Sequence, residues 1–89
     1  MKAVITVIGK DKLGIVSNVT TKVTKLNMNI LDINQTLLEG FFTMVIMVKI
    51  LDENADFTFL SDEFKKLGEN IGVEIRIQHE DLFNAMHRL

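Results

Sequence analysis

The sequence contains no cysteine, proline, tryptophan or tyrosine among its 89 residues. The missing cysteines exclude disulfide scaffolds, cysteine-ligated zinc, Cys-x-x-Cys redox centres and thiol nucleophiles, and they fit the reducing cytoplasm in which we expect the protein to act. The chain also lacks a charge excess, because 10 basic and 12 acidic residues are interspersed and give a formal net charge of −2. This balance provides no electrostatic surface for nucleic acid or an anionic membrane, so we expect neither as a partner.

Long hydrophobic runs are missing as well. The apolar stretch at residues 3–8 is short, contains Thr6 and meets charged residues, with no small-residue cleavage site after it, so it does not have the pattern of a signal peptide. No segment approaches the roughly 20 apolar residues that a membrane helix needs. Hydrophobic residues still make up 47% of the chain and charged residues 25%. We therefore expect a soluble globular domain with one two-layer core.

Hydrophobic periodicity predicts strands at residues 2–8, 29–38, 41–50 and 73–78, and helices at residues 13–26, 57–71 and 81–89. We expect Asn27 to be the left-handed C-cap of the first helix, Asp56 to be the N-cap of the second, and Gly72 to end the second. The last helix would present Leu82, Phe83, Met86 and Leu89 on one side.

The patterns within the strands predict the sheet order. Residues 2–8 and 41–50 are apolar on both faces, which is typical of central strands, whereas residues 29–38 and 73–78 alternate and suit the edges. Right-handed crossovers place the first two helices on one face. We therefore predict an α+β fold, a ferredoxin-like βαββαβ sandwich with an antiparallel sheet ordered 4-1-3-2 and a short C-terminal helix.

This architecture leaves large apolar side chains on the sheet face that the two helices do not cover. Monomers seldom expose a contiguous apolar patch beyond a few hundred Å². We expect a second subunit to cover the face in a homodimer, with or without help from the terminal helix. The alternative is a monomer in which the tail alone covers it.

The loop Gly9-x-Asp11-x-x-Gly14 lies between the first strand and the first helix. Free amides near Leu13, Gly14 and Ile15 form an anion site, and Asp11 adds a negative charge beside it. A zwitterion fits this combination, because its carboxylate can bind the amides while its ammonium group lies near Asp11. In the simpler alternative, Asp11 is the N-cap of the helix.

The chain resembles the ACT domain, a small ligand-sensing module of amino-acid metabolism. The resemblance spans Lys2 to Gln78 and is carried by the opening strand, by residues 9–16, by Leu26-Asn27-Met28-Asn29-Ile30 and by Ile71-Gly72-Val73-Glu74-Ile75. The ending from Ile77 to Leu89 is similar to small stand-alone bacterial members related to regulators of the glycine cleavage system. The resemblance implies an ACT-like domain at residues 1–79 and a helical extension at residues 80–89.

The resemblance also implies an amino-acid site between paired domains. Its loop wall would consist of Asp11, Leu13 and Gly14, with the neighbouring Ile15, and the start of the second strand in the partner would supply Asn29 and Ile30. No cofactor, metal or catalytic residue is implied.

Other kinds of site have weak support in the sequence. The run His79-Glu80-Asp81 with His87 lacks a helical metal-ligand spacing. Ser17 has no histidine near it in sequence, and the loop lacks the arginine of an acylphosphatase-like enzyme. An RNA-recognition strand at residues 39–42 would need a basic residue where the chain has Glu39. We therefore expect no enzyme activity.

Two functions remain open. The first is a non-catalytic, allosteric module that binds an amino acid as a homodimer and reports this to a regulated protein. The second is a protein-interaction module with a vestigial ligand site, which acts through its sheet face or C-terminal helix. Leu13 favours the second, because many ligand-binding members of the family have proline at this position.

Overall fold

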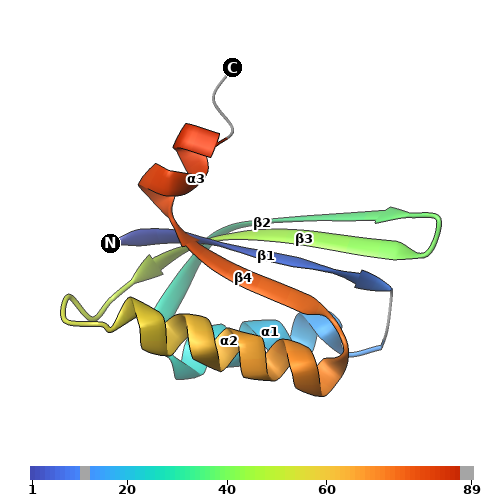
Figure 1. The fold of residues 1–89 in the computed structure, drawn as a ribbon, viewed down its shortest axis with the longest axis horizontal. Coiled ribbons are helices and arrows are strands. Elements are labelled where there is room, and N and C mark those ends of the chain that lie inside the picture. Colours follow the sequence, from blue (N-terminus) through green and yellow to red (C-terminus); the bar gives the residue numbers. More distant parts are fainter. Residues whose placement is uncertain (11–12, 87–89) are drawn as a thin grey trace.

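The computed structural model describes residues 1–10 and 13–86 and has a βαββαβ core followed by a short helix (Figure 1). The strands are β1 (Lys2–Lys10), β2 (Met28–Leu38), β3 (Phe41–Ile50) and β4 (Glu74–His79), and the helices are α1 (Ile15–Lys25), α2 (Phe57–Ile71) and α3 (Glu80–Met86). The sheet is antiparallel with the order β2-β3-β1-β4. The predicted ferredoxin-like fold and strand order are confirmed.

The core lies between the sheet and the pair of helices α1 and α2, which both cover the same face (Figure 1). Alternate residues of the strands point to this face because side chains in a strand have a period of two. Phe64 of α2 is the largest fully buried side chain, and it packs with Ile5 and Ile46 of the two central strands. Truncation of a buried phenylalanine to alanine lowers the stability of a protein by about 3–5 kcal/mol, so Phe64 is a main support of the fold.

The helix ends follow from local chemistry. Asp56 is the N-cap of α2, and its carboxylate accepts hydrogen bonds from the backbone amides of Thr58 and Phe59, as predicted. Gly72 adopts a left-handed conformation at φ 75° and ends α2. The C-cap of α1 is Leu26 and not Asn27 as predicted, although Asn27 follows it with the expected left-handed φ of 57°. The N-cap position of α1 is Gly14, and Asp11, the alternative cap, lies outside the described residues.

The sheet face opposite α1 and α2 is covered at one end by α3 (Figure 1). Val4 points to this face and is nevertheless fully buried, whereas Ile8 and Phe41, farther along the same face, are 49% and 57% exposed. Within the described residues, the tail therefore covers part of the surplus apolar surface and leaves the rest exposed. Residues 87–89, where we expected Leu89 to add to the apolar side of the tail, lie outside the described residues.

No helix in the described part of the chain is long and apolar enough to cross a membrane.

Candidate functional site

The loop after β1 ends in a tight turn that opens helix α1. Gly14 has φ 86° and ψ 4°, a left-handed conformation that glycine adopts at little cost because it has no Cβ. The Gly14 carbonyl accepts the first hydrogen bond of the helix from the Asn18 amide at 2.9 Å and a second one from Asn18 Nδ2 at 2.7 Å. These two hydrogen bonds from Asn18 fix the turn at the N-terminus of the helix.

The first amides of α1 have no acceptor within the helix. An α-helix leaves its first N–H groups unpaired, and here they belong to Ile15 and the residues that follow it. The Ile15 side chain is buried in the core, so this residue offers only its backbone to a ligand. Leu13, by contrast, has a side chain that is fully exposed beside these amides. The loop thus combines hydrogen-bond donors with an exposed apolar side chain, while Asp11 lies outside the described residues.

The two other predicted site residues lie at the opposite end of the sheet. Asn29 and Ile30 follow Met28 at the start of β2, and Ile30 is aligned through Val48 with Ala3 at the start of β1. Gly9, at the other end of β1, is six positions from Ala3, which corresponds to about 20 Å along the strand. Within one subunit, the structure therefore keeps the two predicted walls apart.

Both walls expose apolar side chains all the same. Ile30 is 40% exposed, and the Asn29 side chain beside it also faces solvent. A β-bulge between Ile30 and Asp32 interrupts the pairing of β2 with β3, and it leaves Leu31 48% exposed. Bulges re-aim side chains at sheet edges, and this bulge lies directly after the predicted wall.

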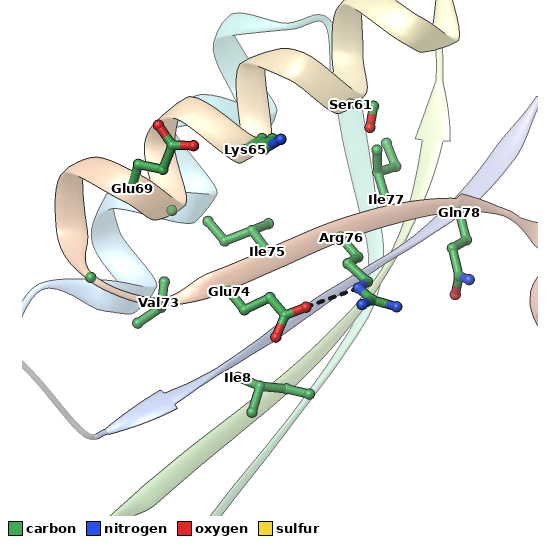
Figure 2. Close-up of a pocket in the computed structure, with 12 residues that line it drawn as sticks. Ile8, Ser61, Lys65, Glu69, Val73, Glu74, Ile75, Arg76, Ile77 and Gln78 are labelled. Carbon is green, nitrogen blue, oxygen red and sulfur yellow. Dashed lines mark hydrogen bonds and ion pairs between the residues drawn. The ribbon is translucent and has the colours of Figure 1, made fainter.

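Two hollows in the described structure were not predicted. One, of about 750 Å³, follows the outer edge of β4 beside α2, and Figure 2 shows Lys65 and Glu69 on the helix side of this strand. The other, of about 370 Å³, lies on the opposite face of the sheet, where Phe83 of α3 forms part of its wall. Neither hollow was predicted from the sequence, because each brings β4 together with residues that are distant in the chain, such as Ile8 or Thr43. For the smaller hollow, the sequence did contain one signal, the hydroxyl of Thr6 within an apolar strand.

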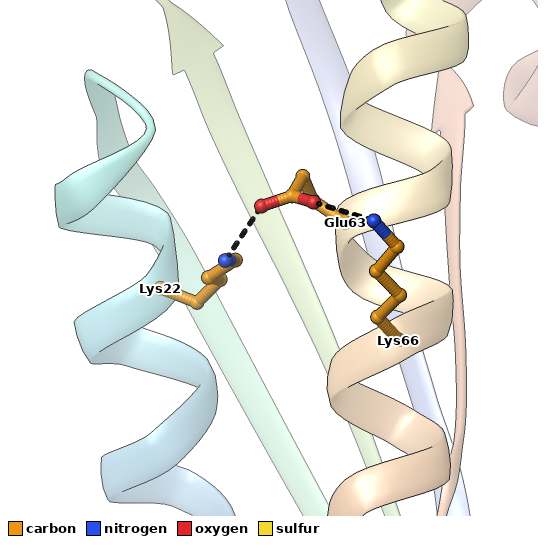
Figure 3. A network of polar contacts seen from close by, with 3 residues as sticks. All are labelled: Lys22, Glu63 and Lys66. Carbon is orange, nitrogen blue, oxygen red and sulfur yellow. Dashed lines mark hydrogen bonds and ion pairs between the residues drawn. The ribbon is translucent and has the colours of Figure 1, made fainter.

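An ion-pair network between the two helices lies away from the predicted site. Glu63 of α2 accepts a hydrogen bond from Lys22 of α1 at 2.9 Å and lies 3.6 Å from Lys66 (Figure 3). The hydrogen bond from Lys22 lowers the pKa of the Glu63 carboxyl, with smaller contributions from the charges of both lysines, against a partial desolvation that raises it. This pair joins the two helices, so its role is structural.

His79 and Asp81 lie close together where β4 meets α3. His79 Nδ1 lies 3.8 Å from Asp81 Oδ2 and accepts a hydrogen bond from the Asp81 amide at 3.3 Å. No group of three or more histidine, aspartate or glutamate side chains that could hold a metal is found in the described ranges, and His87 lies outside them. These contacts close the turn between β4 and α3.

Comparison with known proteins finds similarity over the whole chain. The ACT domain model matches residues 2–78. A UPF0237 protein of Listeria monocytogenes is 47% identical over 89 residues, which are all of this chain and all of that one. A solved ACT domain protein from Streptococcus pneumoniae has 49% identity and a TM-score of 0.85, with 98% of each chain covered.

A more distant solved structure, a candidate glycine cleavage system transcriptional repressor, shares the fold. Its TM-score is 0.77 at 19% identity, with 86% of this chain and 45% of that chain covered. The match to the ACT model covers most of the chain, and the Listeria relative aligns from end to end. This chain belongs to the ACT domain family.

Proposed function

We propose that this protein is a non-catalytic regulatory module of the cytoplasm that binds an amino acid as a homodimer and reports binding to a regulated protein. The ligand would lie between residues 9–15 of one subunit and Asn29 and Ile30 of the other. The observation that carries the proposal is the separation of these two walls by about 20 Å within one chain, although both expose the groups that a ligand would contact. Membership of the ACT family supports the same reading.

The chemistry of the two walls fits an α-amino acid. The free amides at the start of α1 suit a carboxylate, because they carry the positive end of the helix dipole. Asp11 supplies the counter-charge for an ammonium group. Leu13 and Ile30 are exposed apolar side chains that can contact the side chain of the ligand, one from each subunit.

The surface of the β2–β3 hairpin supports a homodimer. The hairpin extends past the end of the helical layer (Figure 1), and Leu37, Leu38 and Phe41 near its tip are 60%, 70% and 57% exposed. Several large apolar side chains that gather on one projection are costly in water. Burial against a second copy would remove this cost and bring a second start of β2 within reach of the loop.

Calorimetric titration of the purified protein with each common amino acid tests the proposal. We expect one or a few to bind with micromolar to millimolar affinity, and Asn29→Ala to weaken binding about tenfold through the loss of a polar contact. Asn34→Ala, at an exposed position farther along β2, is the matched control and should bind as the wild type does. If no amino acid binds at millimolar concentration, the ligand-sensing role is rejected.

A protein-interaction module with a vestigial ligand site is the second candidate. The incomplete cover that α3 provides favours it, because Ile8 and Phe41 stay exposed beyond this helix. Deletion of residues 81–89 separates the two candidates. Loss of partner capture with ligand binding intact would assign the interaction role to this segment, whereas unchanged capture would exclude it.

A further inference from the structure

The hollow on the far face of the sheet, opposite α1 and α2, has a floor that the strand register builds. Thr6 of β1 is aligned with Val45 of β3 and with Arg76 of β4. In the next row, Ile8 is aligned with Thr43 and with Glu74. These rows lie side by side on one face, and Gln78 and Phe83 complete the lining of the 370 Å³ hollow. This volume is within the range of small-molecule sites.

Two hydroxyl groups lie in the middle of this floor. Thr6 and Thr43 are only partly exposed, and neither side chain makes a hydrogen bond to another described residue. Valine has almost the same shape and would pack on the central strands without a polar group. A hydroxyl that is partly removed from water and lacks a protein partner is therefore available to a ligand.

One wall of the hollow carries both signs of charge. Arg76 Nε donates to Glu74 Oε1 at 3.0 Å, and Figure 2 shows both side chains on the same side of β4 as Ile8 and Gln78. A guanidinium group has five N–H donors, so this one bond does not saturate it. The pair is mostly exposed, and exposed ion pairs are weak, so a ligand can approach both partners at little cost.

The rest of the lining is apolar. Ile8 is 49% exposed in the floor, although it belongs to a central strand, and the half-buried ring of Phe83 faces the same hollow from α3. Apolar surface with a few convergent polar groups is the usual composition of a small-molecule site. A pure anion would be repelled by Glu74 and a pure cation by Arg76, whereas a zwitterion satisfies both.

We infer that this hollow is a second ligand site, contained within one chain, for an α-amino acid with an apolar side chain. The carboxylate of the ligand binds Arg76, its ammonium group binds Glu74, and the hydroxyls of Thr6 and Thr43 accept or donate the remaining hydrogen bonds. The side chain of the ligand packs between Ile8 and Phe83. The site is separate from the ligand site proposed above, because none of its residues belongs to the loop or to the start of β2.

Titration of ¹⁵N-labelled full-length protein with L-leucine, followed by amide NMR spectra, tests this inference. We expect saturable shifts at residues 6, 8, 43, 74 and 76. 4-Methylpentanoate lacks the ammonium group and 3-methylbutylamine lacks the carboxylate, so each should bind about tenfold more weakly than leucine. Equal binding of all three compounds would overturn the assignment of a zwitterion.

Variants identify the groups involved. Arg76→Gln should weaken leucine binding at these amides about tenfold, and Thr6→Val should weaken it less while it preserves the shape of the floor. Lys65→Gln is the control, since Lys65 lies on the other side of β4 (Figure 2), and it should change nothing. Thermal melting of each variant checks that it is folded, and an unchanged affinity in folded Arg76→Gln protein would overturn the inference.

The same spectra separate this site from the one at the subunit boundary. Shifts confined to residues 13–15 and 29–30 would support the proposed function and reject the second site. Shifts confined to the far face would support the second site, and the calorimetric titration with the other amino acids would then decide the proposed function. If leucine shifts neither group, the far-face site is rejected.

Discussion

Lys22 of α1 and Glu63 of α2 are 41 positions apart in the sequence, and their side chains form a 2.9 Å hydrogen-bonded ion pair that joins the two helices (Figure 3). The pair lies over the outer side of the helical layer, away from both the loop and the far-face hollow. It provides a probe of helix packing that is independent of ligand binding.

Replacement of Glu63 by glutamine should lower Tm slightly at neutral pH. The pKa of the Glu63 carboxyl is below its ordinary value of 4.5 in the folded protein, chiefly because of the hydrogen bond from Lys22. The contribution of Glu63 to stability is therefore present above pH 4.5 and is lost as the pH falls through the lowered folded-state value. Thermal melts of both proteins across this range should converge in acid. Glu69→Gln, on the same helix but outside this ion pair, is the control and should have the wild-type Tm at neutral pH.

Substitution of Gly14 by alanine should destabilise the protein by about 1–2 kcal/mol, because a left-handed φ of 86° is strained for any residue with a Cβ. The new Cβ would also lie 3.3 Å from Asn18 Nδ2, whose bond fixes the turn. Gly40→Ala is the matched control: its φ is 81° and no atom lies within 4 Å of the added Cβ. Chemical denaturation of both variants should find Gly14→Ala the less stable.

Gly68 in the interior of α2 offers a test in which two effects have opposite signs. Helix propensity alone predicts that Gly68→Ala stabilises the helix by about 1 kcal/mol. A Cβ at this position would, however, lie 2.5 Å from the Val73 carbonyl oxygen, so we expect a net loss of about 1–3 kcal/mol from overpacking. The exposed Asn70→Ala substitution should be neutral or stabilising. Urea denaturation would contradict the account if Gly68→Ala proved more stable than the wild type.

The hairpin tip should govern self-association. Leu38→Glu places a charge where the proposed homodimer buries an apolar side chain, so light scattering should show weakened dimerisation with an unchanged circular dichroism spectrum. Leu51→Glu is the control, because Leu51 is 51% exposed outside the hairpin. A Leu38→Glu protein that dimerises as the wild type does would remove the hairpin from the interface.

Local patterns were sufficient to predict the architecture. The apolar spacing of α2 and the capping residue Asp56 gave this helix its observed bounds, and the strand at residues 41–50 matches β3 residue for residue. The two strands that are apolar on both faces, β1 and β3, form the centre of the sheet, and the two strands that alternate, β2 and β4, form its edges. These features depend on the spacing of apolar residues over short stretches, and a single sequence is sufficient to show that spacing.

Features that depend on register or on single backbone angles were missed. Strand β1 continues to Lys10 because its pairing with Phe41 extends the ladder, and α1 begins at Ile15 because Gly14 turns left-handed. The bulge after Ile30 and the convergence of Thr6, Thr43 and Arg76 require knowledge of which residues face one another across strands. Whether Asp11, Leu13, Gly14, Ile15, Asn29 and Ile30 form a ligand site remains a prediction.

The most direct test of the central claim is a subunit-mixing experiment on the proposed shared site. Asp11→Ala and Asn29→Ala proteins should each bind the amino-acid ligand weakly. After they are unfolded and refolded together, half of the dimers should contain both chains, and each of these has one intact site of its two. Calorimetry should then find wild-type affinity in about a quarter of all sites. If mixing restores no binding, or if the wild-type protein is monomeric under these conditions, the shared site does not exist.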